Sequence, residues 1–187
     1  MTTLKNFSRC LMLAATMAAV AACGGDDSEQ WTGEASVDSL IQDILDGDRD
    51  AFRGVLSTVE RPCKQPGAAD VGEVPCPDGS PGDTAEVFQV TACHAEYRVP
   101  EQFGEVVEAF FGAGSAANDW KLYAAYRGTD ELFGETYRVV FADGNGAGRV
   151  AWIRSSGMVV LVELGCGETA PSALIEGVTE FVVAPAD

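Results

Sequence analysis

Two apolar stripes with helical spacing follow each other early in the chain, and they restrict its fold more than any other feature. The helices are expected after Ser36 and over about residues 49–59. Gly47 suits the residue that ends the first helix, and Asp48 suits the N-cap of the second, so the sequence predicts a tight helical hairpin. The apolar positions of the two stripes are Val37, Leu40, Ile41, Ile44 and Leu45, then Ala51, Phe52, Val55, Leu56 and Val59.

A Pro- and Gly-rich stretch at 60–85 separates the hairpin from a predicted strand at 86–93, and a continuation of that strand to Arg98 is left open. Connections of such length are usually functional or cross-linked. Pro100 fits the first position of a third helix, where its missing N–H costs nothing. The apolar stripe of this third helix consists of Phe103, Val106, Val107, Phe110 and Phe111.

The C-terminal half has the pattern of a β-meander. Short connections containing Gly or Asn separate its strand-like segments, as expected between antiparallel neighbours. The predicted strands are 120–127, 135–142, 148–154 and 158–164, and 174–183 is expected to form a strand or a short helix. Residues 35–187 are therefore predicted to form a single α+β domain, in which the helical hairpin and the third helix pack on a curved antiparallel sheet.

Residues 1–22 have the form of an export signal. Lys5 and Arg9 form a basic region, and the apolar stretch 10–20 is shorter than the about 20 residues that span a bilayer. The run Val-Ala-Ala before Cys23 resembles the lipobox of bacterial lipoproteins, which implies a thioether-linked diacylglycerol on Cys23 and cleavage before it. Residues 23–34 would then be a short lipidated tether at the cell membrane or outer membrane, facing the periplasm or the exterior. The alternative is an ordinary secretory signal cut near Ala22, which leaves Cys23 as a thiol.

The chain is strongly acidic, with 12 Lys and Arg residues against 29 Asp and Glu residues. Residues 1–22 hold two of the basic residues and no acid, so the remaining chain has a net charge of −19. This balance argues against nucleic-acid binding and against electrostatic attachment to anionic headgroups, so the acyl chains would supply the anchor. The acidity fits either a self-repelling soluble surface or an acidic docking face.

Four further cysteines lie outside the signal and the tether, and they allow three pairings. Export permits disulfides. We expect Cys63–Cys76 to close the Pro/Gly-rich loop and Cys93–Cys166 to tie two strand ends. No C-x₂₋₄-C pair is present and His94 is the only imidazole, so neither a metal site nor a cofactor is expected.

Few residues stand out as candidates for chemistry. The aromatic residues of the meander fit either a core or the lining of a pocket. Strand alternation places Trp120 and Tyr126 on one face, and it groups Glu163 with Val159 and Leu161, where an exposed apolar patch would mark an interaction surface. Glu163 is expected to face solvent or a partner. We assign no catalytic residue, and the possible pocket lining consists of Trp120, Tyr126, Tyr137 and Trp152.

The predicted order is two helices, a loop, a strand, a third helix and a meander. This order is similar to that of the nuclear transport factor 2-like cone, the fold of ketosteroid isomerases and SnoaL-like cyclases. Residues 44–52 resemble the helix, Gly-Asp, helix opening of such domains, and the likeness covers about 35–165. It implies a curved sheet around a conical pocket. No catalytic residue of the isomerases aligns with this chain, so none is carried over.

We therefore expect a lipid-anchored extracytoplasmic binding or interaction module. Its ligand would be a small apolar molecule in the cavity or another envelope protein. One alternative is a SnoaL-like or isomerase-type enzyme, which needs a carboxylate, Tyr or His in an apolar cavity. The other is an accessory envelope protein without a pocket. The three hypotheses differ in what occupies the space between the helices and the sheet.

Overall fold

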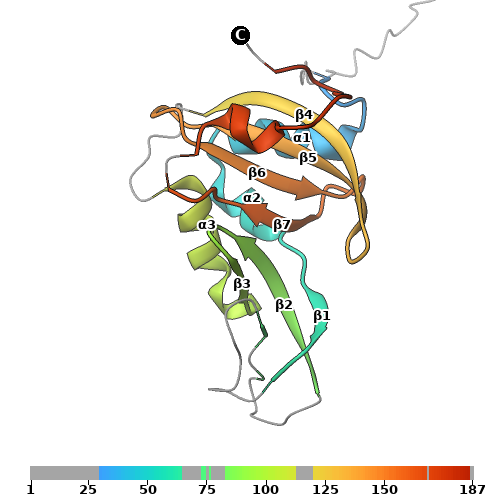
Figure 1. The fold of residues 1–187 in the computed structure, drawn as a ribbon, viewed down its shortest axis with the longest axis vertical. Helices are drawn as coiled ribbons and strands as arrows, with labels where there is room; N and C mark the ends of the chain where they lie inside the picture. The colour runs from blue at the N-terminus through green and yellow to red at the C-terminus, as the bar shows by residue number, and fades with distance from the viewer. Residues whose placement is uncertain are drawn as a thin grey trace, which may run out of the picture.

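The computed structural model describes residues 30–64, 73–74, 76, 83–112, 120–167 and 169–185. These residues form a mixed α+β fold with three α-helices and one curved sheet that does not close on itself (Figure 1). No helix in this part of the chain has the length and apolar character needed to cross a membrane. The helices are α1 (Ala35–Leu45), α2 (Arg49–Gly54) and α3 (Phe103–Phe111), with 3₁₀ turns η1 (Pro100–Gln102) and η2 (Pro171–Ile175).

The sheet contains seven strands in the order β1-β2-β7-β6-β5-β4, and β3 pairs with β2 off this path. The predicted antiparallel meander is confirmed for β4 to β7. One pair departs from the antiparallel expectation, because β2 and β7 run parallel and place Gln89 opposite Leu161. The strands are β1 (Val59–Pro62), β2 (Thr84–Thr91), β3 (Ala95–Arg98), β4 (Lys121–Asp130), β5 (Gly134–Ala142), β6 (Gly148–Ile153) and β7 (Val159–Glu163).

Both faces of the meander are covered. The three helices lie on one face, where their apolar stripes and the inward residues of the strands form the main core. The C-terminal segment crosses the other face with η2 in front of the sheet (Figure 1). Its apolar side chains pack on a second core, and they are Leu174, Ile175, Val178 and Phe181.

Strands β1 and β2, with β3 paired beside β2, extend beyond this body, and β1 and β2 reach the lower end of the molecule in Figure 1. We call them the arm. A small core of its own stabilises it, built around the Cys63–Cys76 disulfide with Ala85 and Val87 of β2. The half-buried ring of Tyr97 packs on this core, and the guanidinium of Arg61 lies 5.5 Å from its centroid.

Both predicted disulfides are confirmed. Cys93 follows β2 and Cys166 follows β7, so their bridge fastens the two parallel strands at the same end. The Cys63–Cys76 bridge joins residues of the predicted Pro/Gly-rich loop. Most of that loop lies outside the described residues, as do the predicted signal, Cys23 and residues 24–29.

The prediction that the second helix reaches residue 59 is wrong, because α2 ends at Gly54. Leu56 instead forms a parallel bridge with Val159, and the amide of Ser57 donates to the Val159 carbonyl. Val59 then begins β1, which the sequence did not reveal as a strand. Leu56 is therefore buried against the start of β7 rather than within a continued helix.

Two bulges overturn the predicted strand faces. A register shift between Leu122 and Ala124 puts Trp120 on the helix-covered face and Tyr126 on the outer face. A second shift, where β6 pairs with β7, separates Val159 from Leu161 in the same way. Both residues are buried, so the predicted apolar patch around them does not exist.

Two connections also differ from the sequence expectation. The predicted turn at 128–129 is part of β4, and the chain turns at 131–133 instead. There the carboxylate of Asp130 accepts hydrogen bonds from the amides of Leu132 and Phe133. The open continuation beyond residue 93 is a separate strand, β3, which folds back antiparallel on β2.

Candidate functional site

The space between the helices and the sheet is filled by aromatic side chains. Phe110 of α3 lies at its centre and is fully buried. Its ring stacks on Phe52 of α2, with centroids 4.7 Å apart, and on Trp120, at 5.5 Å. Phe111 and Phe141 meet the same ring edge-on. Among the described residues, the region around Phe110 is therefore a packed core.

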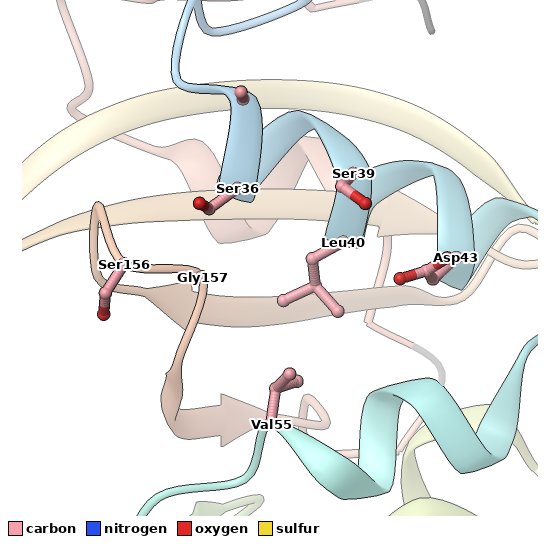
Figure 2. Close-up of a pocket in the computed structure, with 8 residues that line it drawn as sticks. Ser36, Ser39, Leu40, Asp43, Val55, Ser156 and Gly157 are labelled. Carbon is pink, nitrogen blue, oxygen red and sulfur yellow. The ribbon is translucent and has the colours of Figure 1, made fainter. Parts of the chain in front are cut away.

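A groove runs along the outside of α1 instead. It encloses about 400 Å³ between α1, the end of α2 and the turn between β6 and β7. Figure 2 shows Leu40 of α1 pointing toward Val55 across the gap, so these two side chains form an apolar floor. The polar part of the lining comes mainly from the exposed side of α1. The lining residues are Ala35, Ser36, Ser39, Leu40, Asp43, Val55, Ser156 and Gly157.

Local sequence explains why the groove has this shape. Ser156 and Gly157 belong to the tight turn that joins β6 to β7, closed by the bond from the Gly157 amide to the Arg154 carbonyl. Gly157 has a φ of +83°, and a Cβ there would come within 3.1 Å of Ser36. Glycine is therefore required both by the backbone conformation and by the close approach of α1. The contact between Gly157 and Ser36 forms one end of the groove.

Asp43 supplies the negative charge of the groove. Partial burial, followed by repulsion from Asp48 and Asp46, raises the pKa of its carboxyl above the ordinary value. Asp43 also lies in the last turn of α1, where the helix dipole disfavours an anion. Among the described residues, no hydrogen bond or ion pair engages its carboxylate. Asp43 is therefore an unpaired carboxylate among the described residues, and it lines the groove.

Replacing Asp43 by asparagine should therefore raise the melting temperature by about 1–2 °C at pH 7, the size typical of surface substitutions. Because the folded-state pKa is raised, the charged carboxylate costs stability above that pKa and nothing below the unfolded value of about 4. The advantage of Asp43→Asn should disappear as the pH falls toward 3. Thermal unfolding across this pH range measures it. A lower melting temperature at pH 7 would show that Asp43 has a stabilising partner.

A second, smaller hollow of about 210 Å³ is lined in part by Glu34 and Ser155, the sequence neighbours of the groove residues Ala35 and Ser156. The Arg127 side chain lines this hollow. It donates hydrogen bonds to the Tyr137 hydroxyl at 2.6 Å and to the Glu135 carboxylate at 3.5 Å. The guanidinium is thus already neutralised in part. The lining residues are Glu34, Arg127, Glu135, Thr136, Tyr137 and Ser155, so this hollow is polar and carries an excess of acid.

The four aromatic residues assigned to a pocket are not brought together. Trp120 is part of the packed core between helices and sheet. Tyr137 belongs to the same core, and its hydroxyl reaches the small hollow. Tyr126 and Trp152 lie on the opposite face of the sheet, beneath the C-terminal segment. Neither hollow described above is an aromatic-lined pocket.

Tyr126 and Trp152 instead belong to a cross-strand row on the outer face. Arg138 lies directly opposite both of them in register, and its guanidinium carbon is 3.8 Å from the Trp152 ring centroid. The Trp152 indole N–H donates to the Glu163 carboxylate at 2.5 Å. Glu163 therefore has a partner within the same chain. Burial raises the pKa of the Tyr126 phenol, against a hydrogen bond from Arg138 that lowers it. The Arg138 guanidinium is therefore packed between aromatic rings under the C-terminal segment, and its buried Nε has no hydrogen-bond partner among the described residues.

No metal centre is formed by the described residues, where no three His, Cys, Asp or Glu side chains converge. His94 lies 3.2 Å from the carboxylate of Glu96 in the arm.

Sequence reasoning missed the groove residues Ser36, Ser39 and Asp43, which looked like the ordinary solvent side of an amphipathic helix. Only the turn at 155–157 was identified, and its sequence does not indicate which helix it meets.

No family model, curated protein or solved structure matches this chain.

Proposed function

We propose that this chain is a lipid-anchored extracytoplasmic binding domain, and that its groove along α1 receives a basic segment of another envelope protein. The observation that carries the proposal is the contrast between two spaces. Aromatic rings occupy the interior around Phe110, whereas the groove is open and has an apolar floor with a carboxylate beside it. Binding would therefore take place on the surface of the domain.

The chemistry of the groove supports a basic and partly aliphatic occupant. An aliphatic side chain could pack on Leu40 and Val55, and the Asp43 carboxylate could form an ion pair with a Lys or Arg. A cation at Asp43 would relieve the repulsion from Asp46 and Asp48. The net charge of −19 that remains without residues 1–22 would also speed the approach of a basic partner.

The fold supports a filled variant of the nuclear transport factor 2-like cone, since three helices cover one face of a curved sheet. The isomerase-type alternative has less support, because it needs a free polar group in an apolar cavity. Asp38 is a carboxylate buried among the described residues of this face, but it already accepts hydrogen bonds from Thr32 and Gly33. A small apolar ligand would have to displace the stacked rings.

Two observations support the proposed compartment. Both disulfides fit an oxidising environment outside the cytoplasm. The run of residues before Cys23 supports a diacylglycerol anchor, and two acyl chains suffice for stable membrane attachment. Because the domain is strongly acidic, anionic headgroups would repel it, so the lipid would be its means of attachment.

The anchor is tested with Cys23→Ala. The unchanged protein should be recovered in the membrane fraction, and mass spectrometry should find a diacylglycerol on Cys23. Cys23→Ala should abolish this modification and leave either unprocessed precursor or a soluble domain. An unmodified Cys23 in the mature wild-type chain would overturn the lipoprotein proposal and leave the ordinary secretory signal.

The groove is tested with a synthetic hexapeptide of alternating Lys and Val, compared with one of Glu and Val. Amide chemical shifts of the full mature chain should move for Ser36, Ser39 and Gly157 with the Lys peptide alone. Asp43→Asn should weaken this binding by up to about fivefold, since a surface ion pair is worth up to about 1 kcal/mol. Glu86→Gln removes the same charge from the exposed side of the arm and should change little. Equal binding of both peptides would overturn the proposal.

A further inference from the structure

The polypeptide just before α1 is fixed to that helix. Asp38 is 2% exposed, and its carboxylate accepts bonds from the Thr32 amide at 2.8 Å, the Thr32 hydroxyl at 2.7 Å and the Gly33 amide at 3.2 Å. The half-buried Trp31 packs on the main core. The folded part of the chain therefore includes Trp31 to Glu34, which the sequence had placed in the tether.

This arrangement shortens the link between Cys23 and the domain. Trp31 lies eight positions after Cys23 in the sequence. A fully extended chain advances at most about 3.6 Å per residue, so this link can span no more than about 29 Å. The groove begins at Ala35, directly after the fixed segment. The arm reaches the end of the molecule that lies away from α1 (Figure 1).

Resting on the lipid anchor and basic-segment binding proposed above, we infer that the groove faces the membrane side and that its occupant is a membrane-proximal basic segment. Such a segment belongs to a protein that is itself anchored in the same membrane and carries Lys or Arg within about 30 Å of its surface. The arm, at the far end, points away from the bilayer.

Two physical effects favour this partner over a freely diffusing one. Confinement of both chains to one surface raises their effective concentration, and that advantage falls as the connecting chain lengthens. The acidic domain is also repelled by anionic headgroups, so it stands off from the lipid and leaves the groove accessible. Anionic headgroups attract a basic segment, so such a segment is held in the same zone between the membrane and the domain.

The experiment uses vesicles that carry the acylated full mature chain. The probe is a Lys-Val hexapeptide with a photoactivatable phenylalanine, attached to a diacyl lipid through a four-residue Gly-Ser spacer. Cross-linking to α1 is measured for the native tether and for a variant with 40 Gly-Ser residues inserted between Gly25 and Asp26. We expect the longer tether to reduce cross-linking about tenfold, as the scaling of effective concentration with length predicts.

Binding of the same peptide without lipid provides the control. It should be equal for both tether lengths, because the groove itself is unchanged. Equal cross-linking by both tethers, together with normal binding of the free peptide, would overturn the membrane-side inference and leave the proposed function intact. Failure of the free Lys-Val peptide to bind either protein would overturn the proposed function, and the inference with it.

Discussion

Replacing Phe110 by alanine should lower the free energy of unfolding by about 3–5 kcal/mol, the range found for buried Phe-to-Ala changes. Phe110 is fully buried and joins helices to sheet, because its ring meets Phe52 of α2, Trp120 before β4 and Phe141 of β5. Aromatic pairs add about 0.5–1.5 kcal/mol each beyond the area they bury. Denaturant unfolding monitored by tryptophan fluorescence would measure the loss.

Phe181→Ala is the matched control for this change. Phe181 is only half-buried on the outer face and makes one ring contact, with Tyr126 at 6.3 Å. Its loss should cost less than half as much. A cost below about 1 kcal/mol for Phe110→Ala would contradict the packed interior, since surface changes stay near 0.5 kcal/mol. That outcome would favour an apolar cavity between the helices and the sheet.

Removing the Cys93–Cys166 disulfide, by Cys93→Ser together with Cys166→Ser, should cost about 4 kcal/mol. The bridge closes a loop of 73 residues, and the stabilisation from restricting the unfolded chain grows with loop length. The parallel ladder that it fastens is short, with Gln89, Val90 and Thr91 as the paired residues of β2. Domains of ordinary stability have about 5–15 kcal/mol in total. The variant should therefore be close to unfolding at 37 °C.

The Cys63–Cys76 bridge offers the comparison. It spans only 13 residues, so removing both of its cysteines should cost about 3 kcal/mol. Its loss should also be more local, because this bridge stabilises the core of the arm. Urea unfolding under non-reducing conditions would rank the two double variants. A larger loss for the short loop would show that packing in the arm, rather than loop length, determines the effect.

The sequence predicted those parts of the fold that depend on local spacing. The stripe from Val37 to Leu45 led to α1, and the stripe from Phe103 to Phe111 led to α3. Pro100, expected at the first position of that helix, instead begins the 3₁₀ turn η1 that precedes it. Where a distant strand decides the structure, local spacing failed. Leu56 has helical spacing from Phe52, yet it pairs with Val159 at the start of β7. A bridge between positions so far apart leaves no trace in the periodicity of either segment.

The candidate site was beyond prediction for a related reason. Bulges shift the parity of a strand by one residue, and no residue type near Leu122 or Val160 marks them. The aromatic residues of the meander were therefore assigned to the wrong faces. The groove depends on the approach of Ser36 to Gly157, which are brought together only by the folded sheet. The acid at Asp43 is ordinary in sequence and unusual only in its surroundings.

The C-terminal segment has a consequence for behaviour at high concentration. The amides of Val182 and Val183 donate to the Ala125 carbonyl, and the Val183 carbonyl accepts from the Ala125 amide, so this segment occupies the outer edge of β4. An open edge strand is a template for pairing with another chain. At the other end of the sheet, β1 and β3 have four residues each and carry charged side chains. The C-terminal segment therefore blocks pairing with a neighbouring copy at Ala125, in the middle of β4, while shortness and charge disfavour such pairing at β1 and β3.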